Sequence, residues 1–388
     1  MKILLRLYQQ ISFDWLWALF GLTNSHNRAK TGNNTYKSEK RKYPHPKSIS
    51  ALLFFTWFLI GTGLRLINLS GKSPWTDEFS TLVFSLGNSF LGVPLDQAIT
   101  IDTLLQPLQP NPEAGVSDVL THLLNESNHP PLYFTLTHLW LRLFPTNVGL
   151  VSVWGARLLA AICGGLSIPA IFALSWLTFR SRLISHFAAA MMAVSPFGIF
   201  LAQEARHYTL AILWVIATLA CLIITVRHIE NCTRLPIFIA ISWVIVNALG
   251  IATHYFFALT LCAEVFVLCF MIWRKWKHQD ATVENSGLNL LASPWKSIYA
   301  VAFGTFIAGL VWLPIFINNS YGNELTDWIQ GERVGFAWIS PFFQAMAAWI
   351  TMISLLPVEA PQLGVVIASG LVMLIFFIWL TPTLIRFL

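Results

Sequence analysis

The chain has 388 residues, of which 56% are hydrophobic and only 11% are charged. A soluble domain carries about 25% charged residues. So few charges cannot cover a water-facing surface, so the composition excludes an ordinary soluble protein and predicts an integral membrane protein. The formal net charge is +6, and much of the positive surplus is local.

Basic residues cluster in the segment 1–48, ahead of the first long apolar run. They are Arg28, Lys30, Lys37, Lys40, Arg41, Lys42 and Lys47. Such a cluster is more typical of a cytoplasmic flank that contacts anionic lipid than of a nucleic-acid site. We therefore predict a basic cytoplasmic segment over 1–48, a transmembrane domain over 49–388, and membrane lipids rather than nucleic acid as partners. The domain is either complete or continues beyond residue 388.

A helix that crosses a bilayer needs about 20 mainly apolar residues. The stretches that meet this length are 50–69, 156–178, 183–201, 208–226, 236–253, 255–273, 297–317 and 363–384. A polar stretch over about 70–155 separates the first two, and its Pro-rich piece at 106–113 cannot be helical throughout. The sequence thus predicts an all-α polytopic membrane protein with one long loop.

The distribution of Lys and Arg predicts the orientation of the helices. The basic connectors, expected on the cytoplasmic side, are 180–182, 227–234 and 274–277. All three fall on that side, with the loop 70–155 outside, only if the segment 131–144 does not cross the membrane. This segment is apolar but short for a span, and it carries His138 and Arg142. We predict that it lies flat in the membrane interface.

Two motifs in the outer loop carry reactive side chains. The motif WTDE at 75–78 contains Asp77 and Glu78. One of two adjacent carboxylates can act as a general base while the other binds a cation or an acceptor, although solvated loop acids are the commoner case. The motif HPPLY at 129–133 begins with His129, which either donates to a phosphate or carboxylate or is a capping histidine.

A third motif, QEARHY at 203–208, joins two long apolar stretches on the same predicted face. Charged residues at membrane depth usually pair with one another or face a polar cavity, so Glu204 and Arg206 are either a structural pair or part of a site. Arg suits oxyanions because its planar fork binds them with two hydrogen bonds.

Other polar residues have two readings each. His254 either joins this face as a site residue or belongs to the aromatic belt. Arg65 and Arg157, at helix ends, either reach lipid headgroups or join an anionic site. Acids beside a membrane with Arg and His at helix ends describe a site for an anionic amphiphile. Cations would hold its head, and a carboxylate would await a second substrate.

The order and spacing of these motifs resemble the polyprenyl-phosphate-dependent glycosyltransferases of the C-type fold. The motifs are GLR at 63–65, WTDE at 75–78, HPPLY at 129–133, ARL at 156–158 and QEARHY at 203–208. The chain is most similar to family 39, the protein O-mannosyltransferase group, and to its bacterial relatives, including lipid A aminoarabinose transferases. The resemblance covers about residues 50–275.

The resemblance implies a transmembrane helical bundle with interfacial helices in the first outer loop. It also implies a bacterial inner membrane, with the site facing the periplasm, and a polyprenyl-phosphate-linked sugar as donor. The acceptor would be a lipid, a glycan or a protein. Asp77 would be the general base and Glu78 its partner. The residues implied in donor-phosphate binding are Arg206, Tyr208, His129, His254 and Arg157.

No cofactor is required by these motifs. A divalent metal could bind between Asp77 and Glu78, but two acids are too few to demand one. Two rival functions remain open. A lipid or amphiphile transporter or flippase would place charged residues near the bilayer midplane and broken helices in paired halves. A non-catalytic relative would keep the fold and lack the reaction.

Overall fold

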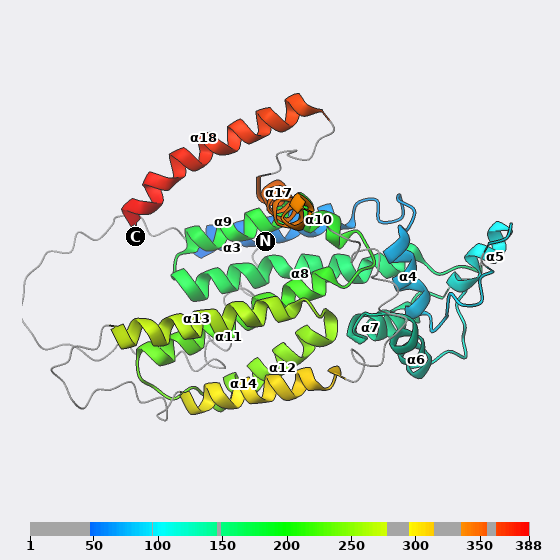
Figure 1. Ribbon diagram of the computed structural model, residues 1–388, viewed down its shortest axis with the longest axis horizontal. Helices are drawn as coiled ribbons and strands as arrows, with labels where there is room; N and C mark the ends of the chain where they lie inside the picture. Colours follow the sequence, from blue (N-terminus) through cyan, green and yellow to red (C-terminus); the bar gives the residue numbers. More distant parts are fainter. Residues whose placement is uncertain are drawn as a thin grey trace, which may run out of the picture. The chain divides into compact units, whose positions relative to one another are not determined.

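The computed structural model describes residues 47–94, 96–145, 149–277, 295–313, 335–354 and 362–387 (Figure 1). Within these ranges all regular structure is helical, and no strand occurs. The all-α prediction is therefore confirmed for this part of the chain. The predicted basic segment 1–48 lies almost entirely outside the described residues.

Among the described residues, four helices are long and apolar enough to cross a membrane by length and composition. They are α3 (Lys47–Leu66), α8 (Val153–Phe179), α11 (Tyr208–Glu230) and α13 (Phe257–Lys277). Large apolar side chains of α3, such as Leu52 and Leu59, are 68% and 67% exposed. A membrane would cover such surface, since lipid tails are as apolar as these side chains.

A fifth candidate span is a bent pair, α9 (Arg182–Val194) and α10 (Pro196–Ala202). Other apolar helices fall short of the spanning criterion over their described residues. They are α12 (Ile237–Thr253), α14 (Trp295–Leu310) and the Leu363–Ile375 part of α18 (Leu363–Phe387). The described chain also contains η3 (Gly335–Trp338) and α17 (Ser340–Ser354). Crossing by the shorter helices stays a prediction.

The predicted span at 183–201 is a bent pair rather than one straight helix, because α9 and α10 meet at an angle of 55°, and the pair stays a candidate span. Pro196 occupies the first turn of α10, where its missing N–H is not needed. Ser195 caps that turn, since its Oγ accepts from the Gly198 N–H at 3.1 Å. These two residues end α9 and begin α10.

Arg65 donates hydrogen bonds to backbone carbonyl groups in the last turn of α9, which have no helical partners beyond the break. Its Nη1 donates to Ala193 O at 3.0 Å and its Nη2 donates to Met192 O at 2.7 Å. The side chain is 0% exposed. The structure thus places Arg65 as a buried cap on the last turn of α9 rather than at a lipid headgroup.

The chain divides into two compact units. The first contains Met1–Phe58, Pro169–Ala189 and Ala211–Pro314, and the second contains Leu59–Ile168, Ala190–Leu210 and Ile315–Leu388. In the first unit, α12 and α14 run side by side, and their contact includes buried Ile239, Trp243 and Val301 (Figure 1). Glu264 of α13 is also buried there, and it accepts a hydrogen bond from Thr218 Oγ1 at 2.6 Å.

In the second unit, the predicted outer loop folds into short helices. They are α4 (Thr76–Ser85), α5 (Ile101–Leu105), the 3-10 helix η1 (Gln106–Leu108), α6 (Val116–Glu126) and α7 (Leu132–Leu141). The prediction that 106–113 is not helical throughout is confirmed. The segment 131–144 contains a helix of only 10 residues, as expected, and its position in a membrane stays a prediction.

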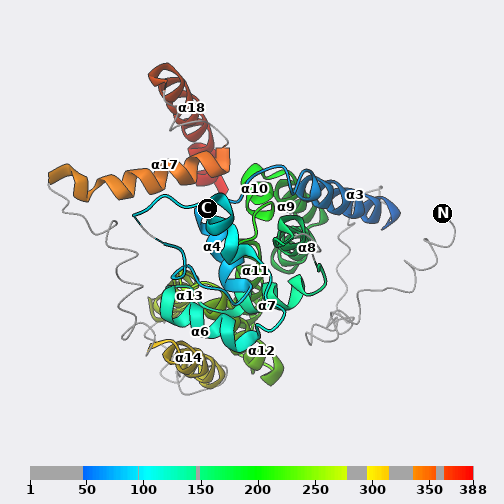
Figure 2. The ribbon, with the colours of Figure 1, turned by 90° about the vertical axis from the view of Figure 1, so that its right-hand side faces the viewer.

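Three of these short helices, α4, α6 and α7, pack against one another (Figure 2). Their shared core contains Phe84, Val119, Leu123 and Phe134, each at most 2% exposed. Burial of such side chains stabilises by about 1.5–3 kcal/mol each. The core holds the first turn of α4, with its two acids, in a fixed place within this unit.

Candidate functional site

The site begins at the first turn of α4. Trp75 is in an extended conformation at the N-cap, and Asp77 and Glu78 follow in the first turn, where a carboxylate is favoured by the helix dipole. Adjacent helical residues point about 100° apart. Accordingly the Asp77 side chain is 47% exposed and the Glu78 side chain is 0% exposed. The two acids therefore have different environments.

Glu78 forms a buried ion pair with Arg157 of α8. Its Oε1 accepts from Arg157 Nε at 2.7 Å, and its Oε2 accepts from Arg157 Nη2 at 2.7 Å. Oε1 also accepts from the Ala205 N–H at 2.7 Å. This carboxylate thus joins α4, α8 and the 203–207 loop, all within the second unit.

Arg157 directs its remaining donors inward as well. Nη1 donates to Leu69 O at 2.6 Å and to Lys72 O at 2.9 Å, which ties down the segment after α3. The side chain is 2% exposed. This arrangement favours a positioning role for the pair, so the predicted contact between Arg157 and a donor phosphate is not carried into the function proposed below.

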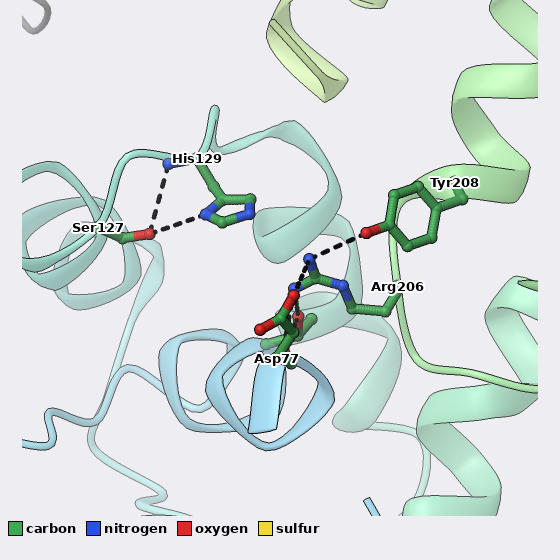
Figure 3. Close-up of polar contacts among 6 residues, drawn as sticks. Asp77, Ser127, His129, Arg206 and Tyr208 are labelled. Carbon is green, nitrogen blue, oxygen red and sulfur yellow. Dashed lines mark hydrogen bonds and ion pairs between the residues drawn. The ribbon is translucent and has the colours of Figure 1, made fainter. Parts of the chain in front are cut away.

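Arg206 lies against Asp77 (Figure 3). Its Nη2 is 3.3 Å from Asp77 Oδ2, and its Nη1 donates to Asp77 O at 2.9 Å and to Thr81 Oγ1 at 2.9 Å. The Arg206 side chain is 3% exposed, and its Nε has no hydrogen-bond partner among the described residues. The result is a buried guanidinium beside a half-exposed carboxylate.

Two aromatic rings flank the Arg206 guanidinium. Its Cζ is 5.4 Å from the Tyr208 ring centroid and 5.8 Å from the Trp75 ring centroid. Nη2 also donates to the Tyr208 hydroxyl at 3.3 Å (Figure 3). Cation–π contacts hold a guanidinium in place without neutralising its charge. The charge that balances Arg206 in this site is therefore the Asp77 carboxylate, which is 3.3 Å away and half-exposed.

His129 lies between α6 and α7, where the Ser127 hydroxyl is 3.2 Å from its Nδ1 (Figure 3). Its ring centroid is 5.6 Å from that of His207, which is itself 4.6 Å from the ring of Tyr208. The structure thus brings His129 near Tyr208 through His207. A direct phosphate contact by His129 stays a prediction.

His254 belongs to the other unit. It is the C-cap residue of α12, its Nδ1 accepts from the Phe256 N–H at 3.1 Å, and its ring stacks on Phe256 with centroids 5.2 Å apart. These contacts match the local, aromatic reading of the residue. Its predicted role in donor binding is not tested by them.

Two further buried groups are Glu204, which the sequence offered either as a structural partner of Arg206 or as part of a site, and Tyr133, to which it assigned no role. Glu204 is 5% exposed, and Asp77 rather than Glu204 is the acid that pairs with Arg206. Burial raises the pKa of Glu204, and the nearby Glu78 carboxylate raises it further. Burial also raises the pKa of Tyr133 far above its usual range. The sequence feature that could have pointed to Glu204 is its position inside the QEARHY motif.

The suggested metal does not fit this geometry. Both Glu78 oxygens are engaged by Arg157, so Asp77 and Glu78 cannot act together as ligands. In the part of the chain that the structure describes, no three or more His, Cys, Asp or Glu side chains are grouped in a way that could hold a metal ion. No step below therefore uses a metal.

Comparisons with protein-family models, with curated proteins and with solved structures found no match for this chain. The resemblance to C-type glycosyltransferases consequently depends on the ordered motifs alone, and family membership stays a prediction.

Proposed function

We propose that this protein is a membrane glycosyltransferase that moves a sugar from a polyprenyl-phosphate-linked donor to a lipid, glycan or protein acceptor. The observation that carries this proposal is the pairing of a half-exposed Asp77 with a buried Arg206. A carboxylate that solvent can reach is suited to accept a proton, and a buried cation beside it is suited to an anionic leaving group.

In the proposed reaction, an Asp77 oxygen takes the proton of the acceptor hydroxyl or amine. The acceptor atom attacks the anomeric carbon, and the bond between that carbon and the phosphate oxygen breaks. The lipid phosphate leaves with the bonding electron pair, and the configuration at the anomeric carbon is inverted. Arg206 stabilises the phosphate as its negative charge grows.

The donors of Arg206 support this assignment. Nη1 anchors the side chain to α4 through short bonds, whereas Nη2 has only long contacts of 3.3 Å to Asp77 and Tyr208. Nε has no partner among the residues described. Nη2 is therefore the donor that can exchange its long contacts for a phosphate oxygen while Nη1 keeps the anchor. Tyr208 and His129 are further candidates for the phosphate, and the predicted periplasmic location remains part of the proposal.

The direct test is transfer of a labelled sugar from a polyprenyl-phosphate donor by the purified protein in proteoliposomes. Asp77→Asn keeps the size and removes the base, so transfer should fall about 10²–10⁴-fold. Asp102→Asn, at an exposed acid of α5 in the same unit, is the matched control and should transfer sugar at the wild-type rate. Transfer at the wild-type rate by Asp77→Asn would show that the assignment is wrong.

A lipid or amphiphile transporter is the second candidate, because two observations fit it. The α9–α10 pair is a broken apolar helix, and Glu264 is a buried acid within a candidate span. Flux of a fluorescent polyprenyl phosphate across proteoliposomes, measured beside donor turnover, separates the two functions. Flux without turnover would favour the transporter, and turnover without flux would favour the enzyme.

A further inference from the structure

Glu204 is a buried acid that no basic residue neutralises. It lies in the loop between α10 and α11, its side chain is 5% exposed, and its Oε2 has no hydrogen-bond partner among the described residues. Within the same part of the chain it takes part in no ion pair. An ionised carboxylate in this setting is costly, because burial removes hydration and the neighbouring Trp75, Lys72 and Arg206 replace only part of it.

The neighbouring charges are already matched with one another. Glu78 pairs with Arg157, and Arg206 pairs with Asp77. Lys72, before α4, places its ammonium 4.8 Å from the Phe200 ring centroid and is exposed. An ionised Glu204 would therefore add an unmatched negative charge to a site that is proposed to bind an anion.

The pKa of Glu204 is raised first by burial and then by repulsion from the Glu78 carboxylate. A hydrogen bond from Trp75 and the positive charges of Lys72 and Arg206 act in the opposite direction and do not cancel the rise. The geometry and the electrostatics agree that the proton is held more tightly on Glu204 than on an ordinary glutamate.

We propose that the Glu204 carboxyl keeps its proton while the site binds a phosphodiester, and that loss of this proton weakens anion binding at Arg206. Glu204 is thus a positioning residue for the anion, and this link to anion binding rests on the proposed function. Binding is reciprocal, so a bound phosphodiester would strengthen the hold of Glu204 on its proton by the same factor.

The effect on stability has a definite sign. The folded protein holds the proton more tightly than the unfolded chain does, so the contribution is fully present below the ordinary pKa of glutamate. It is lost as the pH rises through the higher folded pKa. Glu204→Gln resembles the neutral acid at every pH. The stability of this variant should therefore not show the fall with rising pH that Glu204 causes in the wild-type protein.

The first experiment measures the thermal unfolding midpoint in detergent between pH 5 and pH 9. The midpoint of the wild-type protein should fall with rising pH by about 2–4 °C more than that of Glu204→Gln. Glu113→Gln, at an exposed acid of the same unit, should follow the wild-type curve. Parallel curves for wild type and Glu204→Gln would overturn the proposal.

The second experiment measures binding of a dialkyl phosphodiester in mixed detergent micelles. This probe keeps one negative charge over the whole pH range, so any change in affinity belongs to the protein. From pH 6 to pH 9 the wild-type affinity should fall about tenfold, and that of Glu204→Gln less than about twofold. Equal pH dependence in both proteins would overturn the link to the anion.

The two experiments separate this proposal from the function on which it rests. Absence of probe binding by the wild-type protein at every pH, and unchanged binding by Arg206→Gln, would each count against the proposed phosphate site. The unfolding curves test independently whether folded Glu204 holds its proton tightly, because this experiment needs no ligand. A difference in the unfolding curves with no difference in binding would confine Glu204 to a role in stability.

Discussion

The two units each bury a polar cluster, and the clusters differ in the kind of group they use. In the second unit, the paired acids and arginines are Asp77 with Arg206 and Glu78 with Arg157. In the first unit, Thr218 Oγ1 lies 2.6–2.9 Å from polar atoms of three other residues. These residues are Asn247, Glu264 and Trp243.

The difference concerns which cluster is exposed enough to meet a substrate. The first unit's cluster connects α11, α12 and α13 through neutral hydroxyl, amide and indole groups and one acid, and all four side chains are buried. The second unit's cluster combines a fully buried ion pair with one acid that reaches solvent. A reaction needs a group that meets substrate, so only the second cluster is suited to catalysis. The first is suited to hold helices together.

The largest expected effect comes from separating Glu78 from Arg157. Arg157→Met would leave the Glu78 carboxylate buried and unpaired, which should destabilise the protein by about 3–5 kcal/mol. Adding Glu78→Gln removes that charge and keeps an oxygen for the Ala205 N–H, so the double variant should regain much of the loss. Thermal unfolding of the single and double variants measures both effects. A single variant that unfolds at the wild-type temperature would contradict the positioning role.

This pair also marks the limit of what the sequence could tell. The WTDE motif predicted a reactive pair of acids at Asp77 and Glu78, and both do lie in the first turn of α4. Sequence alone could not assign them separate environments, because burial depends on α8, which lies far along the chain. The pairing of Glu78 with Arg157 was not predictable for the same reason, since the two residues are 79 positions apart. Phosphate binding by Arg157, which the resemblance implied, stays a prediction.

The length of the apolar runs predicted the helices well, because a run of about 20 apolar residues is too long for a typical strand and favours a helix. The break between α9 and α10 was missed although its signal was present. Ser195 followed by Pro196 is a capped helix start with Pro in the first turn. The pairing of Arg206 with Asp77 was not predictable in the same way, since a long-range fold decides which acid reaches it.

A smaller and more specific effect should follow from the same conservative change at both arginines. Lysine keeps the charge but loses the planar fork. Arg206→Lys should lower the rate of sugar transfer by the folded protein about 10–100-fold, because the planar fork proposed to hold the phosphate is lost. Loss of the bonds to Asp77 O and Thr81 Oγ1 should also lower its unfolding temperature. Arg157→Lys should mainly lower the unfolding temperature. Initial rates of sugar transfer, corrected for the folded fraction, separate the effect on the reaction from the effect on stability. A reversal of this pattern would exchange the roles given to the two residues.

The smallest expected effect tests the first unit. Thr218→Val keeps the shape and removes the hydroxyl that Asn247, Glu264 and Trp243 share, so it should destabilise by about 1 kcal/mol. Transfer by the folded fraction should stay unchanged. Thr56→Val is the matched control, because among the described residues the Thr56 hydroxyl bonds to Leu52 O of its own helix alone. A loss of sugar transfer in Thr218→Val with normal stability would mean that the first unit's cluster contributes to function, and the division between catalytic and packing clusters would fail.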